Sequence, residues 1–235
     1  MKKHIPNTLT CCNLLCGCLS IYFSAIDRFD LAFCLILLAA VFDFLDGFVA
    51  RLLKVSSEIG KELDSLADCV TFGVAPSMSL LFVLLSTDVL PVYACFLPLV
   101  MAAFSAVRLA KFNLDTRQTD SFIGLATPSN AIFWSSLVAS LEPSALPVLA
   151  YWCLAVFPLL SSYLLVSEIP FFSLKFHSFL WKENKIRFVF LIGTLLFIVA
   201  GIVVCFICDN HRALLSLGWV VILWYSIVNL FNLRK

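Results

Sequence analysis

Long apolar runs, separated by short polar stretches, dominate the sequence. Most runs hold about twenty residues, the length that an α-helix needs to cross about 30 Å of hydrocarbon. The pattern predicts eight membrane-spanning helices. The fifth run is short, so we expect a tilted helix, a kinked helix or a merger with its neighbour, and Pro128 favours a helix start there because proline is tolerated in the first turn. The predicted spans lie near residues 8–26, 31–53, 63–86, 90–111, 127–141, 145–166, 184–207 and 212–231.

Composition agrees with this pattern. Hydrophobic residues make up 62% of the 235-residue chain, against roughly 45–50% in soluble domains. Charged residues make up only 13%, about half of the usual share. These values exclude an ordinary soluble domain. They predict an all-α, polytopic transmembrane helix bundle that forms a single membrane domain over residues 1–235.

The basic residues predict how this bundle is oriented. If the N-terminus lies in the cytoplasm, fourteen of the sixteen Lys and Arg residues lie on the cytoplasmic side, and only Arg28 and Arg212 lie outside. Cytoplasmic loops of membrane proteins carry such an excess of basic residues. We therefore expect an even number of spans with both termini cytoplasmic. The net charge of +1 gives no reason to expect a nucleic-acid partner.

Four aspartates lie at the cytoplasmic side of the second and third predicted spans. Asp43 and Asp46 are three residues apart, and Asp64 and Asp68 are four apart, so each pair shares one helical face. An acid inside a span costs at least about 2.5–3.5 kcal/mol on insertion and indicates function. A short loop joins the two helices, which predicts that they are antiparallel neighbours. We therefore expect the four acids to converge on one point.

Four converging carboxylates repel one another in a low-dielectric site, and a divalent cation relieves that repulsion. Oxygen ligands suit hard ions such as Mg²⁺, Mn²⁺ or Ca²⁺, and Mg²⁺ commonly joins carboxylates to substrate phosphates. Two ions bridged by shared carboxylates also fit the pattern. The alternative is a structural set of interhelical hydrogen bonds or ion pairs with Arg51, Lys54 and Lys61.

Small residues lie beside the first pair of acids. Gly47 and Ala50 leave room for a bulky group to approach the helix, and Arg51 can bind a phosphate through its guanidinium fork. Helix packing is the alternative explanation for the small residues. Together with a metal ion, these residues predict a pocket for a nucleotide diphosphate.

The stretch from Asp43 to Asp68 reads D-x2-D-G-x2-A-R-x8-G-x3-D-x3-D, which resembles the signature of the CDP-alcohol phosphatidyltransferases at every fixed position. The resemblance implies a six-helix catalytic core, a homodimer, and one or two divalent cations, Mg²⁺ or Mn²⁺, held by Asp43, Asp46 and Asp64. It implies that Asp68 helps to bind metal or acts as the general base. The implied residues that bind CDP-diacylglycerol are Thr10, Asn13, Asp43, Gly47, Ala50, Arg51, Gly60 and Asp64.

Within this family, the segments 5–13, 60–76, 108–113 and 122–128 resemble the phosphatidylserine synthases, with Ala126 standing where we expect proline. The resemblance implies transfer to L-serine at the cytoplasmic face of a bacterial inner membrane. A free amino acid needs a cation for its carboxylate and acceptors for its ammonium. The residues expected to bind serine are Arg108, Lys111, Asn113 and Thr127.

Alternatives remain for the acceptor and for the class of protein. Arg108, Lys111 and Arg117 would also suit the phosphate of glycerol 3-phosphate or an inositol phosphate, or they are simply basic residues that flank a loop. A cation-coupled transporter also holds buried acids, but it predicts internal repeats, and the C-terminal half has no second D-x2-D-G. We expect residues 5–135 to form the catalytic half and residues 145–235 to form variable outer helices.

Overall fold

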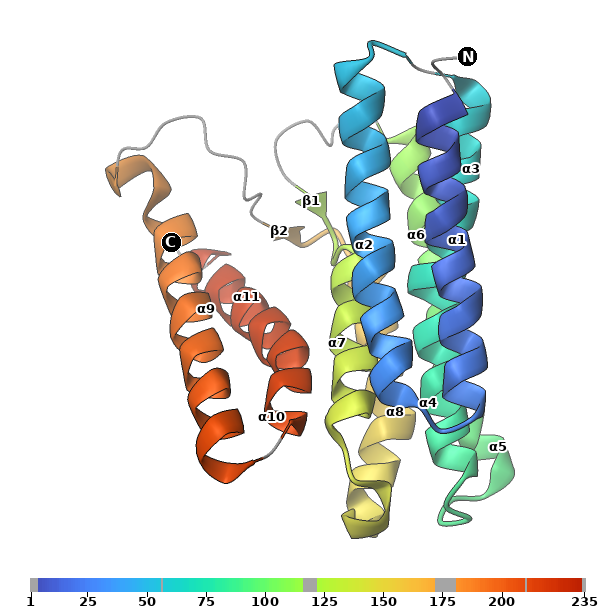
Figure 1. Ribbon diagram of the computed structural model, residues 1–235, viewed down its shortest axis with the longest axis vertical. Helices are drawn as coiled ribbons and strands as arrows, with labels where there is room; N and C mark the ends of the chain where they lie inside the picture. Colours follow the sequence, from blue (N-terminus) through green and yellow to red (C-terminus); the bar gives the residue numbers. More distant parts are fainter. Residues whose placement is uncertain (1–3, 56, 116–121, 172–180, 210, 234–235) are drawn as a thin grey trace.

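The computed structural model describes residues 4–55, 57–115, 122–171, 181–209 and 211–233. Its helices run alternately up and down (Figure 1). The third pass is continuous through three helical segments, and the fourth is broken near Pro98. The helices of the first four passes are α1 (His4–Ala25), α2 (Phe29–Leu52), α3 (Glu58–Asp68), η1 (Cys69–Val74), α4 (Ala75–Leu85), α5 (Val92–Cys95), η2 (Leu97–Leu99) and α6 (Val100–Leu114).

The later passes form the rest of the bundle. A hairpin of two long helices lies beside the other passes and contacts them through its second helix, which packs on the fifth pass (Figure 1). The helices of these passes are α7 (Thr127–Ser140), η3 (Pro143–Ala145), α8 (Val148–Val166), α9 (Trp181–Cys208), α10 (Arg212–Leu215) and α11 (Leu217–Leu233).

Each of the eight apolar runs forms a helical pass, so the predicted all-α membrane bundle is confirmed. Seven described helices are long and apolar enough to cross a membrane. The exception is α7, which has 14 residues. It is separate from α8 and begins one residue before Pro128, as expected of a proline in the first turn. Because α7 packs against α2, α4 and α11, protein covers much of its surface, and a full lipid-facing span is not required.

The first, second and third passes pack closely because small residues line their contacts. A side chain at Gly17 would lie 2.8 Å from the Cα of Thr71, so only glycine allows α1 and η1 this approach. Near the opposite end of the bundle, the hydroxyl groups of Ser24 and Ser79 are 2.6 Å apart. This close packing holds the first and third passes together along their length.

A π-helical segment, η1, follows Asp68 directly in the third pass. A π-helix has wider turns than an α-helix and is often found near functional sites. No feature of the apolar pattern predicted it. It changes the rotation of the helix between the acids and the buried face around Ser77.

A short antiparallel pair of strands, β1 (Phe122–Ile123) and β2 (Pro170–Phe171), joins the start of α7 to the end of α8. The backbone nitrogen of Gly124 donates to the carbonyl oxygen of Ile169 at 2.9 Å, and that of Leu125 donates to Leu164 at 3.0 Å. Gly124 has a φ of +76°, which favours glycine. These contacts fix the segment after α8 against the segment before α7.

Candidate active site

Three of the four predicted acids form one group. One carboxylate oxygen from each of Asp43, Asp64 and Asp68 lies within 4.8 Å of the others. Asp43 comes from α2, and the other two come from α3, which begins with the Ser57 hydroxyl accepting a hydrogen bond from the Gly60 nitrogen at 3.0 Å. The antiparallel packing expected for these two helices therefore brings the acids together.

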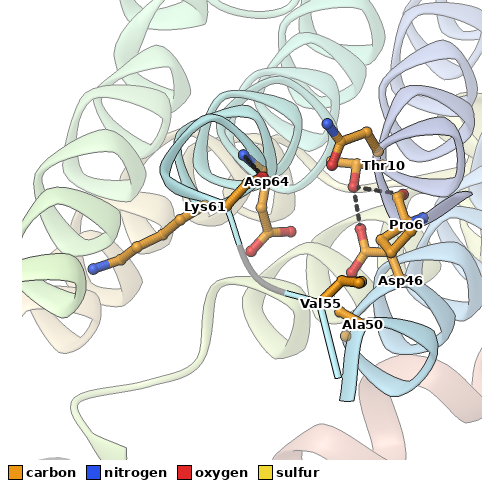
Figure 2. Close-up of a pocket in the computed structure, with 11 residues that line it drawn as sticks. Pro6, Thr10, Asp46, Ala50, Val55, Lys61 and Asp64 are labelled. Carbon is orange, nitrogen blue, oxygen red and sulfur yellow. Dashed lines mark hydrogen bonds between the residues drawn. The ribbon is translucent and has the colours of Figure 1, made fainter. Parts of the chain in front are cut away.

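Asp46 lies beside this group and faces another helix. Thr10 of α1 donates its hydroxyl hydrogen to Asp46 Oδ2 at 2.6 Å, and Figure 2 shows the two side chains pointing toward one another. Asp46 and Asp64 line the same cleft. The expected convergence of four acids thus takes the form of a group of three with Asp46 next to it.

A second side chain of α1 orients Asp68. The amide nitrogen of Asn13 donates to Asp68 Oδ1 at 3.0 Å, and the Thr71 hydroxyl donates to the Asn13 backbone oxygen at 3.1 Å. Asn13 is fully buried and Asp68 is buried. The carboxylate of Asp68 is therefore held in one orientation by a neutral donor rather than by a basic residue.

The chemistry of this group fits a divalent cation. Asp64 Oδ1 is buried and has no hydrogen-bond partner among the described residues, and a buried anionic oxygen left in this way is costly. The structural alternative was a set of interhelical hydrogen bonds or ion pairs with Arg51, Lys54 and Lys61, and Asp46 and Asp68 do accept hydrogen bonds from α1. However, Arg51 Nε donates to the Gly47 oxygen at 3.0 Å, and Lys61 Nζ donates to the Asn113 oxygen at 2.9 Å. In Figure 2, Lys61 points away from the acids.

A cleft of about 270 Å³ opens beside the acids, between the start of α1, the end of α2 and the start of α3. Of the residues expected to bind CDP-lipid, Asn13, Asp43 and Arg51 lie outside its lining. A side chain at Gly47 would meet no atom within 4 Å, so this glycine leaves open space rather than a helix contact. The lining residues are Pro6, Asn7, Thr10, Asp46, Gly47, Ala50, Val55, Ser57, Gly60, Lys61 and Asp64 (Figure 2).

Sequence reasoning missed the part of α1 that lines this cleft. Pro6 and Asn7 belong to the lining and were not predicted. A usable signal was present, because Asn7, Thr10 and Asn13 recur every three residues along a largely apolar helix. Such spacing puts polar side chains near one helical face.

The residues expected to bind the acceptor separate into two places. Arg108 Nη1 donates to the Thr127 hydroxyl at 2.9 Å, and Arg108 and Lys111 line a second cleft of about 320 Å³. Asn113 instead donates its amide hydrogen to the Ser65 hydroxyl at 2.7 Å. The structure therefore brings Arg108, Lys111 and Thr127 together, and it directs Asn113 toward α3.

The packing of α6 on the third pass sets the level of Arg108. A side chain at Gly73 would lie 2.9 Å from Ser105 Cβ. Ser65 lies eight residues before Gly73, Asn113 lies eight residues after Ser105, and the side chains of Ser65 and Asn113 are hydrogen-bonded. Interpolating between these two antiparallel pairs brings a position near residue 110 opposite Asp68. Arg108 therefore lies within about one helical turn of the level of Asp68.

Comparison with known proteins agrees with this site. Residues 3–228 match the family model described as CDP-alcohol phosphatidyltransferase. A protein of Bacillus subtilis (strain 168), named CDP-diacylglycerol–serine O-phosphatidyltransferase, is 37% identical over 176 residues, which cover 75% of this chain and 94% of that protein. The chain belongs to the CDP-alcohol phosphatidyltransferase family. All four acids and both clefts of this family member lie within the matched residues.

Two further relatives carry the same name. The protein from Helicobacter pylori (strain J99 / ATCC 700824) is 39% identical over 132 residues, which cover 54% of each chain. The protein from Mycobacterium leprae (strain TN) is 36% identical over 174 residues, which cover 71% of this chain and 57% of that protein. The match thus spans little more than half of these two longer relatives. CDP-alcohol phosphatidyltransferases depend in general on a divalent cation, which agrees with the acidic group.

Proposed function

We propose that this integral membrane protein transfers the phosphatidyl group of CDP-diacylglycerol to the hydroxyl group of L-serine, which yields phosphatidylserine and CMP. The observation that carries the proposal is the group formed by Asp43, Asp64 and Asp68 at a cleft that the family motif lines. The names of the Bacillus, Helicobacter and Mycobacterium relatives support serine as the acceptor.

Asp43, Asp64 and Asp68 would hold Mg²⁺ or Mn²⁺, as one ion or two, with Asp46 completing the set of acids. Their mutual distance and the unpartnered Asp64 oxygen support this assignment. When bound, the cation supplies neutralisation of the charge on the diphosphate and on the phosphoryl oxygens. The hydrogen bond from Thr10 keeps Asp46 turned toward the cleft.

The cleft between α1, α2 and α3 would hold the nucleotide diphosphate of CDP-diacylglycerol. Gly47 and Ala50 line it without filling it, and Gly60 forms part of its far wall. Arg51 is exposed one turn beyond Gly47 and bonds to that glycine's backbone. Its guanidinium is thus close enough to the lining to neutralise charge on the departing CMP. The acyl chains remain in the bilayer and reach the site from the side, between helices.

Serine would enter from the cytoplasm beside Arg108, Lys111 and Thr127, with Asn113 at the edge of the mouth. Its hydroxyl oxygen attacks the phosphorus nearest the lipid. The bond from that phosphorus to the bridging oxygen breaks, and CMP leaves with the electron pair. Asp68 accepts the hydroxyl proton, and Asn13 keeps its carboxylate oriented for this role. One phosphorus–oxygen bond replaces another, so no covalent enzyme intermediate is required.

We infer the setting of the reaction from the distribution of charge and from the family to which the chain belongs. We infer a bacterial cytoplasmic membrane, both termini and the site at the cytoplasmic face, and a homodimer. The excess of basic residues near the acids supports this orientation. Residues 5–135 would carry the metal and nucleotide chemistry, and residues 145–235 would form the outer helices.

The decisive experiment follows CMP release by the purified protein from CDP-diacylglycerol, with Mg²⁺ or Mn²⁺ and one acceptor at a time. We expect release with L-serine, and none with glycerol 3-phosphate or an inositol phosphate. Release with glycerol 3-phosphate but not with serine would overturn the acceptor alone. A protein that releases no CMP with any of these acceptors would not be the proposed transferase.

A further inference from the structure

The second cleft has walls from both halves of the chain. Arg108 and Lys111 of α6 lie on one side, and Ser167 and Glu168, directly after α8, lie on the other. Its volume of about 320 Å³ is roughly ten times the share of one water molecule in the liquid, about 30 Å³. The cleft therefore has room for a small polar molecule with some of its water.

Arg108 lines this cleft although only 8% of its surface is exposed, which is unusual for a charged residue. Its Nη1 donates to Thr127, but its Nε is buried and has no hydrogen-bond partner among the described residues. A buried guanidinium with an unused donor is stabilised when an anionic group binds to it, and its planar fork suits a carboxylate. Lys111 adds a second positive charge on the same side of the cleft.

Glu168 supplies a negative charge opposite Arg108 and Lys111, and hydrogen bonds hold the backbone around it in place. The hydrogen bonds of Gly124 and Leu125 hold the residues on both sides of it, and a side chain at Gly124 would lie 3.0 Å from the Ser167 oxygen. The Glu168 side chain is exposed and lines the cleft, and within the described ranges it has no ion-pair partner. Asp115 is the other acid of the lining, and it already takes part in another interaction.

The two sides of the cleft match the two charges of an α-amino acid, whose carboxylate and ammonium groups share one carbon atom. We propose that Glu168 accepts hydrogen bonds from the ammonium group of the substrate while Arg108 and Lys111 bind its carboxylate. This rests on the proposed function, and it makes Glu168 a determinant of acceptor specificity. An acceptor with a phosphate and no ammonium group would meet the negative charge of Glu168 without compensation.

The test compares L-serine with 3-hydroxypropionate, which is serine without its amino group, in the full-length protein. For Glu168→Gln we expect the KM for serine to rise about 10–100-fold, as for loss of a hydrogen bond to a charged group. We expect kcat and the KM for CDP-diacylglycerol to stay within twofold. The preference for serine over 3-hydroxypropionate, as a ratio of kcat/KM, should fall at least about tenfold.

Two further variants make the result specific. Glu62→Gln removes the same charge from an exposed residue of α3 that lines neither cleft, and it should leave the preference unchanged. Glu168→Asp keeps the charge and should recover part of the preference for serine. The proposal is overturned if Glu168→Gln keeps the preference of the unmodified protein. It is also overturned if both Glu168 variants impair CDP-diacylglycerol binding, because the role is then structural. If the unmodified protein releases no CMP with serine, the proposed function itself fails.

Discussion

Asn13 of α1 and Asp68 of α3 share a buried hydrogen bond 3.0 Å long, from the amide nitrogen of Asn13 to Oδ1 of Asp68. The bond ties a helix that carries none of the four acids to the acid assigned as general base. Because Asn13 is neutral, it orients the carboxylate without neutralising its charge.

Asn13→Ala should therefore lower kcat about 10–100-fold, because a catalytic group that is no longer held in position loses much of its effect. The KM for CDP-diacylglycerol should change little. Ser24→Ala is the matched control, since it removes another buried hydrogen bond of α1, to Ser79, far from the acids. Steady-state CMP release measures both. Equal losses in the two variants would mean that Asn13 serves only stability.

The acids themselves should differ in their effects. Replacing Asp43, Asp64 or Asp68 by Asn should lower CMP release at least about 1,000-fold, because each removes one member of the group that lies within 4.8 Å. Asp46→Asn should be milder, about 10–100-fold, as for residues that orient a metal ligand, because its carboxylate bonds to Thr10. Asp68→Asn should largely retain binding of CDP-diacylglycerol.

Titration with Mn²⁺, in parallel with CMP release, separates these roles. The affinity for Mn²⁺ should fall in the Asp43 and Asp64 variants, and chelation of the metal should abolish activity in the unmodified protein. If Asp46→Asn weakened Mn²⁺ binding as strongly as Asp43→Asn, the division between the group of three and Asp46 would be wrong.

Thr10→Val should weaken activity through Asp46. It removes the donor to Asp46 Oδ2 while keeping nearly the same shape, so the carboxylate is free to turn from the cleft. We expect kcat/KM for CDP-diacylglycerol to fall about tenfold. Thr8→Val is the control on the same helix, because the exposed Thr8 hydroxyl bonds, among the described residues, to the His4 oxygen alone. An effect of Thr8→Val as large as that of Thr10→Val would argue against this role.

Two glycines should respond to alanine in opposite ways. At Gly17 the new methyl group would lie 2.8 Å from the Cα of Thr71, and such overpacking destabilises by about 1–3 kcal/mol. At Gly47 it would meet nothing within 4 Å, so stability should be unchanged or higher, while the KM for CDP-diacylglycerol rises because the cleft narrows. Thermal unfolding in detergent and substrate titration distinguish the two outcomes. A lowered melting temperature for Gly47→Ala would contradict the open space seen there.

Much of the fold could be predicted because hydrophobicity alone defines spans in a bilayer. The eight apolar runs matched helical passes, and helical spacing correctly brought Asp64 and Asp68 of α3 into one group. Local sequence patterns did not indicate how each helix is rotated about its own axis relative to its neighbours. The side chain of Asp46 faces α1 rather than α3, and this depends on how the helices turn against one another. The π-helical segment after Asp68 depends on the same packing.

The acceptor region was harder to predict for a different reason. Glu168 lies far along the chain from Arg108, in a part expected to be variable. The packing of α8 on α6 and the contact between Gly124 and the end of α8 bring it near. Asn113 shows that closeness in sequence can also mislead. It is close to Lys111 in sequence, yet its side chain turns to Ser65.

The pairing of β1 with β2 also has a consequence for how the protein is made. Residue 68 is synthesised a hundred residues before residue 168, which at about 5–20 residues per second is an interval of about 5–20 s. A nascent chain therefore holds all four acids while the far wall of the cleft at Arg108 does not yet exist. A ribosome that stopped between α7 and α8 would release into the membrane a protein with its acids complete and its second cleft open on one side.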